Sequence, residues 1–410
     1  MKTTKTGRVL VVGDDMRIFL SNVRAFGRAG KTVEAFPYGP SPSLKSRFLS
    51  KVHTAPVFDT DQQGWRDALL GLLRRESFDM VVPCSDPAII FLDSVSHLLA
   101  HQRLAIPAHE AMDIFYDKEE THRLCEGLGI PMAPSARLRP SDKASDLVAR
   151  FSLPLVLKPR RTFFAEKDQA REVVEIADTE SEVQRILGTI TQHANYIIEG
   201  FFVGEGVGVS VLAKEGRILQ SFQHRRLREG KGGASSFRVS EKVDPELREA
   251  CAKVISRVNH TGVCMFEFRH NPQTGAWILI ETNARFWGSM ALPLALGLDY
   301  PNMLYELMVD GRVPEERPYM AGVRSRNLLL DGYNLLQRLR HIRTSTAAGW
   351  LGDAGDFALQ PVRWLKGTER SDSFVADDLK PALWEFTLLA AKIAKVAKSR
   401  PAAIPLERSS

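Results

Sequence analysis

A continuous apolar run near the start of the chain constrains the fold most. The residues RVLVV, at positions 8–12, lead directly into Gly13. Such a run is typical of a strand buried on both faces of a parallel sheet, with helices on either side. Helical and extended segments then alternate, which predicts an open α/β sheet. We expect helices over 18–29, 65–75 and 87–100, and strands over 32–36, 79–83 and 104–106.

The turn after this first strand bears on the kind of ligand. Residues 13–17 are Gly-Asp-Asp-Met-Arg, so the GxGxxG fingerprint is missing and a dinucleotide dehydrogenase is disfavoured. Asp14 and Asp15 stand at the carboxyl end of the strand, where open α/β sheets bind ligands. The same two carboxylates also suit the first turn of the next helix, so both roles stay open.

Length and composition set the class of protein. The 410 residues predict two or three domains, and 44% apolar with 25% charged residues is typical of a globular chain. The net charge of +6 is spread along the sequence and fits an anionic small ligand as well as nucleic acid. Because no Lys/Arg-rich block is long enough for a nucleic-acid arm, we expect no nucleic-acid partner. Four cysteines without a CxxC pair predict a reduced, cytoplasmic protein. We expect neither a signal peptide nor a membrane-spanning helix.

The middle of the chain changes character after residue 117. A helix is expected over the first part of DKEETHRLCEGLGIPMAP, ending at Gly129, and another over 180–189. Strands are expected over 153–160 and 195–202, and then in a largely antiparallel set over 207–212, 217–224, 263–269 and 277–284. The last 90 or so residues are expected to be mostly helical.

A hairpin that carries candidate metal and anion ligands is predicted over residues 262–289, GVCMFEFRHNPQTGAWILIETNARFWGS. Glu267 lies about as far before the polar turn as Glu281 lies after it, and such partners sit roughly 5–8 Å apart. Because side chains alternate, Glu281, Asn283 and Arg285 share one face. Two carboxylates and an amide oxygen suit Mg²⁺ with phosphate oxygens, and Arg285 offers a planar fork to a phosphate or carboxylate.

A solvated hairpin with charged residues facing outward is the alternative. It is disfavoured because apolar residues occupy both faces, and buried charges usually have a partner or a metal. The apolar residues are Met265, Phe266, Phe268, Ile278, Leu279 and Ile280.

Four further motifs precede the hairpin. They are Asp117-Lys118 at a helix start, Gly129-Ile130-Pro131, Val156-Leu157-Lys158-Pro159 and Ile198-Glu199-Gly200-Phe201. Together with Glu267 and Glu281-Thr282-Asn283-Ala284-Arg285, they resemble the ATP-grasp superfamily over roughly residues 1–315. That superfamily includes biotin carboxylase, carbamoyl phosphate synthetase and D-alanine–D-alanine ligase. The segments His224–Glu229 and Gly232-Gly233-Ala234-Ser235 look most similar to its predicted carboxylate–amine ligases.

The resemblance implies an α/β protein of three parts. The expected parts are a pre-ATP-grasp open-sheet domain over 1–112, an ATP-grasp module over 113–317 and a mostly helical extension over 318–410. Within the module, the smaller lobe is expected at about 113–198 and the larger lobe at about 199–317.

The resemblance also implies roles for individual residues. Lys118 and Lys158 match the two lysines that hold ATP phosphates, and Glu199 matches the acidic residue that binds a ribose hydroxyl. The backbone of Ile198, Glu199, Gly200 and Phe201 would bind adenine. The ligands of Mg²⁺, or of Mn²⁺ in its place, would be Glu267, Glu281 and Asn283, and Arg285 would lie at the acyl-phosphate site.

One segment departs from the family pattern. Residues 160–166, Arg-Arg-Thr-Phe-Phe-Ala-Glu, contain no glycine where a glycine-rich lid over the phosphates is usual. Either Arg160 and Arg161 replace the backbone contacts to ATP, or the lid is shortened. We favour a working enzyme with a modified lid.

The stretch HRRLREGKGGASS, residues 224–236, is expected to form a basic loop over the site. Arg225, Arg226 and Arg228 suit a substrate carboxylate, and we assign Arg225 and Arg228 to it. A solvated surface loop is the alternative. His224 and His260 are left unassigned, because a lone histidine is more often structural.

The implied activity is an ATP-dependent carboxylate–amine ligase that forms an amide through an acyl phosphate. A carboxylate–thiol ligase and a non-catalytic ATP-binding module are the alternatives. The expected partners are a small-molecule carboxylate and an amine, with a homodimer as one assembly state. The C-terminal helix over 383–398 either packs on the body with a solvated face, which we favour, or contacts a membrane surface.

Overall fold

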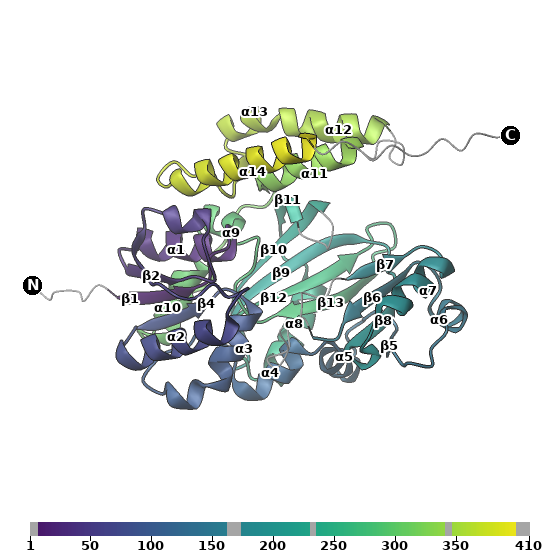
Figure 1. Ribbon diagram of the computed structural model, residues 1–410, viewed down its shortest axis with the longest axis horizontal. Helices are drawn as coiled ribbons and strands as arrows, with labels where there is room; N and C mark the ends of the chain where they lie inside the picture. Colours follow the sequence, from purple (N-terminus) through teal and green to yellow (C-terminus); the bar gives the residue numbers. More distant parts are fainter. Residues whose placement is uncertain (1–6, 162–173, 230–234, 341–346, 399–410) are drawn as a thin grey trace, which may run out of the picture.

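The structure is a computed structural model, and it describes residues 7–161, 174–229, 235–340 and 347–398. Figure 1 shows an N-terminal α/β unit at the left, a large sheet in the centre and a small sheet with its helices at the right. A layer of helices lies along the top. The predicted α/β class is confirmed.

The N-terminal sheet has four parallel strands in the order β3-β2-β1-β4, as the apolar run predicts. Val9 and Val11 pack toward α1, while Leu10 and Val12 pack toward α2, so both faces of β1 are buried. The expected strand over 104–106 is a single bridge to Val81. The elements are β1 (Arg8–Val12), α1 (Ile18–Arg28), β2 (Thr32–Phe36), η1 (Pro42–Lys45), β3 (Leu49–Val52), α2 (Gln62–Arg75), β4 (Met80–Pro83), α3 (Asp86–Ser94) and η2 (Ser96–Leu98).

The two aspartates after β1 have structural partners. Asp15 accepts hydrogen bonds from the backbone N–H groups of Ile18 and Phe19, at 2.6 and 3.0 Å, and so caps α1. Asp14 accepts one from the N–H of Gly39 at 2.8 Å. Of the two roles left open by the sequence, the structure shows the capping of a helix and the fastening of a loop.

The smaller lobe is a four-stranded sheet in the order β5-β8-β6-β7, covered by α6 and α7. Two helices, α4 and α5, join it to the N-terminal unit (Figure 1). The elements are α4 (His109–Tyr116), α5 (Lys118–Gly127), β5 (Ser135–Arg137), α6 (Ala144–Phe151), β6 (Leu155–Pro159), β7 (Glu175–Ala177), α7 (Glu180–Thr189), η3 (His193–Asn195) and β8 (Tyr196–Gly200).

The large sheet has seven strands in the order β13-β12-β9-β10-β11-β14-β15, antiparallel except for the last pair. The predicted antiparallel set is confirmed. The loop expected over 224–236 is wrong for most of its length, because β10 and β11 occupy all of it except 230–234, which lie outside the described residues. The elements are β9 (Glu205–Lys214), β10 (Arg217–Glu229), β11 (Ser235–Glu241), α8 (Pro245–Arg257), β12 (Gly262–His270), β13 (Trp277–Asn283), α9 (Ala291–Ala295), α10 (Tyr300–Met308) and β14 (Arg324–Arg326).

The two faces of the large sheet differ in chemistry. Val209, Val211 and Phe266 lie on the face that packs against α8 and α4. The opposite face packs apolar residues against α1, α9 and α10 at one end only. Its other end carries polar residues, among them His224 and Glu267, which face each other across Gly208 of β9.

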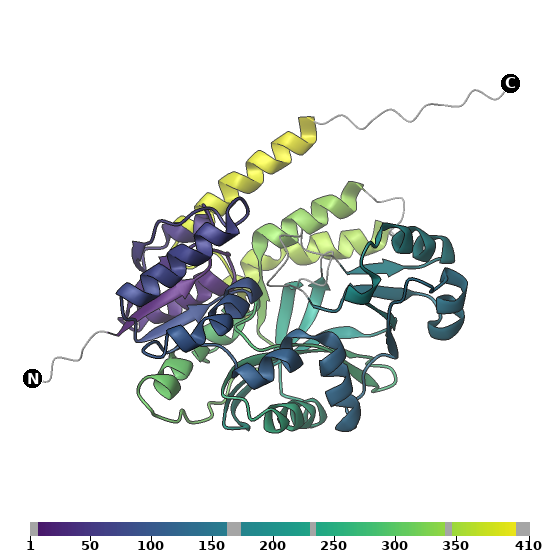
Figure 2. The ribbon, with the colours of Figure 1, turned by 60° about the horizontal axis from the view of Figure 1, so that its bottom comes forward.

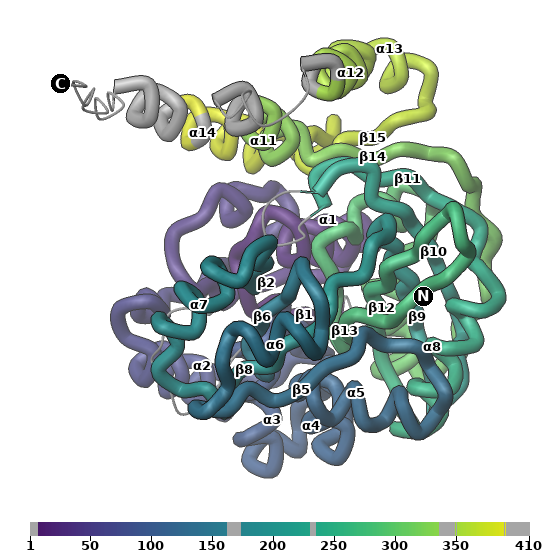
Figure 3. The backbone as a smooth tube through the Cα atoms, turned by 90° about the vertical axis from the view of Figure 1, so that its right-hand side faces the viewer, coloured from purple at the N-terminus to yellow at the C-terminus, as the bar shows by residue number. Residues whose placement is uncertain are grey.

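The C-terminal extension is helical, as predicted, but it also contributes strands. The segments β14 and β15 pair with each other and complete the large sheet beneath the helices (Figure 3). Figure 2 shows α14 extending along the N-terminal unit and away from α11 and α12. The elements after β14 are α11 (Leu328–Arg340), α12 (Ala347–Ala358), α13 (Gln360–Leu365), β15 (Glu369–Ser371) and α14 (Lys380–Lys398).

Among the described residues, no helix is both long and apolar enough to cross a membrane.

Candidate active site

The hairpin of β12 and β13 brings the expected metal ligands together. Glu267 lies directly opposite Glu281, and Met265 lies opposite Asn283, so all three oxygen-bearing side chains share one face. Burial raises the pKa of Glu281, and the like charge of Glu267 adds to this, while Lys118 opposes it. Glu281 is therefore a buried carboxylate whose charged form a bound cation would stabilise.

A cleft opens beside this hairpin. It collects residues from five regions: the start of α3, the helices α4 and α5, the segment between α5 and β5, strand β6 and strand β13. Its lining residues are Asp86, Phe115, Tyr116, Lys118, Thr121, Met132, Lys158, Ile280, Glu281, Thr282 and Asn283.

Both expected phosphate lysines line this cleft. Lys118 is the first residue of α5, whose N-terminus is capped by Asp117. Burial lowers the pKa of Lys118, Glu281 opposes this shift, and the nearby positive charge of Lys158 lowers it further. Two ammonium groups that repel each other beside a buried carboxylate are arranged to receive an anion.

The strand-end glutamate has a partner in the cleft wall. Lys158 Nζ lies 2.7 Å from Glu199 Oε1, and both side chains are buried. The pair joins β6 to β8, which are neighbours in the small sheet. Glu199 therefore holds Lys158 in place, and the contacts of Lys158 with a phosphate and of Glu199 with a ribose stay predictions.

Much of the backbone that is expected to bind adenine is already hydrogen-bonded within the protein. Ile198 is buried in the core of the smaller lobe, and β8 is paired on both sides. The N–H groups of Gly200 and Phe201 donate to the carbonyls of Pro134 and Pro154, at 3.1 and 3.2 Å. Adenine binding by this backbone stays a prediction.

Arg160 and Arg161 fasten the start of α5 to the end of β6. Their Nε atoms donate to the two carboxylate oxygens of Asp117, at 2.8 and 2.9 Å, and Arg161 also donates to Asp113 at 2.9 Å. The N–H of Lys118 donates to the carbonyl of Arg160 at 3.0 Å. Both arginines thus have a structural role, and their contact with phosphates stays a prediction. Residues 162–166 of the expected lid lie outside the described residues.

The assignment of the substrate arginines needs a correction. Arg225 points to the opposite side of β10, where it donates to Glu241 at 2.6 Å and Glu205 at 3.1 Å. Arg228 is buried against the C-terminal helices, where Asp331 accepts its hydrogen bond at 2.5 Å. Neither guanidinium reaches the paired glutamates, because carboxylates elsewhere hold both.

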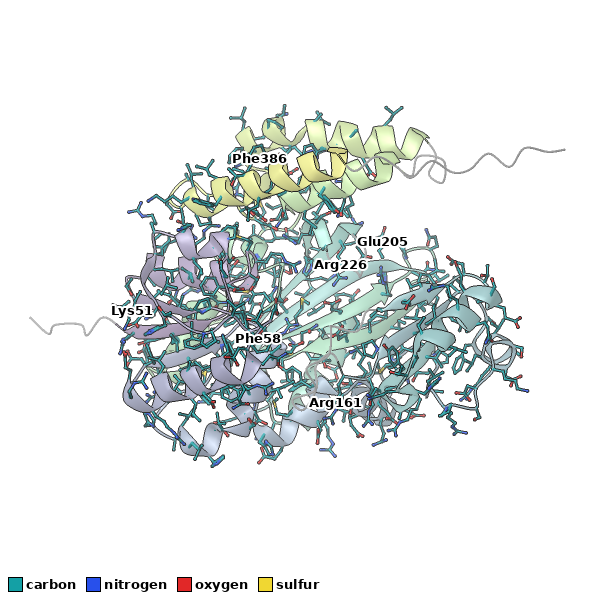
Figure 4. All side chains as sticks on the ribbon, in the orientation of Figure 1. Lys51, Phe58, Arg161, Glu205, Arg226 and Phe386 are labelled. Atoms are coloured by element: carbon teal, nitrogen blue, oxygen red, sulfur yellow. The ribbon has the colours of Figure 1, made fainter. Side chains whose placement is uncertain are left out.

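Arg226 is the arginine of this motif that reaches the site. Its Nη2 donates to Glu267 Oε2 at 2.5 Å, from a strand two positions away in the sheet. Figure 4 shows Arg226 on the large sheet, below the layer of C-terminal helices. This arginine is a candidate for the substrate carboxylate or the transferred phosphate, since its fork suits either anion.

Two glycines on β9 make this reach possible. A Cβ on Gly206 would lie 2.7 Å from Arg226 Cδ, and one on Gly208 would overlap the His224 ring. Both side chains therefore lie flat across β9, toward β12. Burial holds the pKa of His224 well below its usual range, and the charges of Arg238 and Arg226 add to this, so the imidazole is neutral.

Arg285 is tied to the N-terminal unit. Its Nε donates to Asp86 Oδ1 at 2.5 Å. Burial alone would lower the pKa of Arg285, but Asp86 outweighs it and raises that pKa. Sequence reasoning missed Asp86, although it begins the helix after the buried strand β4, where open sheets carry ligand-binding residues.

A family model matches the part of the chain that carries the hairpin of β12 and β13. The family model described as carbamoyl-phosphate synthase L chain, ATP binding domain, matches residues 219–299. These residues include most of β10, all of β12, the paired glutamates and Arg285. No curated protein matches the chain by sequence.

Solved structures match over most of the chain. An L-amino acid ligase from Bacillus licheniformis has a TM-score of 0.57 at 18% identity, covering 75% of each chain. The N5-carboxyaminoimidazole synthetase from Staphylococcus aureus, complexed with ADP, has 0.61 at 15% identity, covering 83% of this chain and 87% of that one.

A third structure is the biotin carboxylase domain of the Hydrogenobacter thermophilus 2-oxoglutarate carboxylase. Its TM-score is 0.61 at 14% identity, covering 78% of this chain and 74% of that one, and it was solved with MgADP and bicarbonate. The chain has the ATP-grasp fold. The resemblance that the five motifs indicate is thus confirmed at the level of the fold.

Proposed function

We propose that the protein is an ATP-dependent ligase that joins a carboxylate to an amine. An oxygen of the carboxylate attacks the γ-phosphorus of ATP, which releases ADP and leaves an acyl phosphate. The amine nitrogen then attacks the acyl carbon, so that phosphate leaves and an amide forms. No covalent bond to the protein is needed, so the chain contributes positioning and electrostatics.

The residues of the cleft suit the positioning and the electrostatic stabilisation of the reacting groups. Lys118 and Lys158 bind the phosphates of ATP, with Glu199 holding Lys158 in place at 2.7 Å. Arg226 pairs with Glu267, and Arg285, held by Asp86, is close enough to Glu281 for its charge to lower the pKa of that carboxyl. Either guanidinium can bind an acyl phosphate formed at the paired glutamates.

The donor set also fits Mg²⁺. Glu267, Glu281 and Asn283 offer hard oxygens on one face, and the raised pKa of Glu281 shows a buried charge that a cation would stabilise. Among the described residues, no three His, Cys, Asp or Glu side chains form a metal site by themselves. This agrees with an ion whose remaining ligands are nucleotide phosphates. When bound, the ion neutralises phosphate charge.

The observation that carries the proposal is the position of Glu267 opposite Glu281 at a cleft that also holds two lysines. A non-catalytic nucleotide-binding module has no need of the glutamates, Asn283 and Arg285 together. The chemistry of the acceptor, amine or thiol, depends on the substrate experiment below.

The test has two arms. Mg-ATP at millimolar concentration should raise the unfolding temperature, and removal of Mg²⁺ by a chelator should reverse the rise. A screen of carboxylates with amines or thiols should then find pairs that release ADP and phosphate together. A protein that shows neither the thermal shift nor ADP release would refute the proposal, and one that shows only the shift would be the non-catalytic module.

We further propose the domain boundaries 1–112, 113–317 and 318–410, with the lobes of the module dividing at about residue 198. The homodimer and the cytoplasmic location stay predictions.

A further inference from the structure

The C-terminal extension has an unusual distribution of charge. Each acidic side chain that the structure describes between 347 and 390 is buried or half-buried, and six of the seven form ion pairs with arginines. The seventh, Glu385, is half-buried, and burial raises its pKa. The pairs are Asp353 with Arg228, Asp356 and Glu369 with Arg326, Asp372 with Arg238, Asp377 with Arg28 and Asp378 with Arg24.

These ion pairs attach the extension firmly to the body. Arg228 and Arg238 come from β10 and β11 of the body, and Arg24 and Arg28 come from α1, whereas Arg326 belongs to β14 of the extension itself. Arg24 and Arg326 are buried almost completely, so their pairs are shielded from water and salt. The extension is thus a fixed layer whose inner side holds the acidic groups.

Its outer side is apolar and basic. Leu365 is 90% exposed, and Trp384 and Phe386 are 52% and 55% exposed. Figure 4 labels Phe386 in the layer of helices at the top of the molecule. The exposed large apolar residues of the described extension from 351 onward are Leu351, Leu359, Val362, Trp364, Leu365, Leu379, Leu383, Trp384, Phe386 and Leu388. Those of α14 lie on more than one side of the helix, and Lys45 Nζ of the N-terminal unit lies 5.4 Å from the centroid of the Trp384 ring.

The exposed charges in the same region are positive. Lys366 and Lys380 are exposed beside the apolar residues. Tryptophan, phenylalanine and leucine together with lysine are the composition that lies in the interface of an anionic bilayer. Apolar patches of this extent are rare on the free surface of a protein.

We propose that the outer face of α12, α13 and α14 docks on the surface of an anionic lipid bilayer. Charge decides between this partner and a second copy of the chain. In a two-fold contact the face would meet itself, so lysines would face lysines without a carboxylate between them. Anionic lipid headgroups supply the missing negative charge, while the apolar side chains enter the boundary of the acyl chains.

The test uses the purified full chain and co-sedimentation with vesicles. We expect the protein to pellet with vesicles of phosphatidylcholine and phosphatidylglycerol, less with phosphatidylcholine alone, and less at high salt. The double variant Lys366→Glu/Lys380→Glu should weaken binding to anionic vesicles roughly tenfold or more. Trp384→Ser/Phe386→Ser should weaken binding to both kinds of vesicle.

The matched control is Val313→Ser/Met320→Ser, which removes two exposed apolar side chains that lie outside α12, α13 and α14. It should bind as the wild type does. A wild type that stays in the supernatant would overturn the proposal, as would equal losses in both apolar double variants. A dimer in sedimentation velocity that Trp384→Ser/Phe386→Ser abolishes, without vesicle binding, would assign the face to a second copy instead.

Discussion

Replacing Glu281 with glutamine tests two effects of its charge separately: the destabilisation of the folded protein by a buried carboxylate, and the contribution of that carboxylate to nucleotide binding. Burial and the charge of Glu267 raise the pKa of Glu281, so the ionised carboxylate is unfavourable in the folded chain. Glu281→Gln keeps the shape and removes this charge. Without nucleotide, the variant should therefore unfold at the same temperature as the wild type or at a higher one.

With Mg-ATP present, the wild type should instead unfold at a higher temperature than Glu281→Gln. At about 100 times Kd, a ligand stabilises the wild type by about 2.7 kcal/mol. Loss of one charge-assisted contact, at about 1.5–3 kcal/mol, raises Kd roughly 10- to 150-fold. At the same nucleotide concentration the variant then gains only about 0.3–1.4 kcal/mol.

The assay is thermal unfolding with and without Mg-ATP, and Glu205→Gln is the matched control. Glu205 stands on the same sheet but pairs with Arg225, outside the cleft (Figure 4). The control should keep the full nucleotide-dependent shift. If Glu281→Gln also kept it, the glutamate would not be a ligand of the metal–nucleotide complex, and the reasoning would fail.

Three further predictions follow from single contacts. Arg226→Ala should lower the catalytic efficiency of ADP release roughly tenfold or more, whereas Arg225→Ala should leave it nearly unchanged; equal losses would contradict the correction made above. Arg326→Leu leaves buried carboxylates without their cation and should destabilise the extension by about 3–5 kcal/mol, measured as faster hydrogen exchange in β14 and α11; unchanged exchange would contradict it. Burial lowers the pKa of His260 from 6.5 to about 4. Between these two pH values only the unfolded state takes up the proton, so the free energy of unfolding decreases as the pH falls. From about pH 7 to pH 5 the wild type should lose about 2 kcal/mol more than His260→Gln in denaturant titrations, and parallel curves would count against this.

Local patterns in the sequence were enough to predict that a single hairpin brings Glu267 and Glu281 together. The period of two along β13 puts Glu281 and Asn283 on one face. Continued from the turn, the register would place Glu267 opposite Ile280, and a β-bulge between Glu267 and Phe268 shifts it so that Glu267 lies opposite Glu281. The same holds for β1, whose apolar run is buried on both faces because helices cover both. In these cases the deciding interactions lie within a few residues or within one strand pair.

The tertiary structure decided the partners of the arginines. Which of Arg225, Arg226 and Arg228 faces the cleft depends on the register of β10 against β9 and on Gly206, which leaves room for one side chain to cross. The carboxylate that holds Arg228 comes from Asp331, 103 residues further along the chain. An arginine in a sequence shows its charge but not its partner, because a long side chain pairs with whichever carboxylate the packing of distant elements brings within reach.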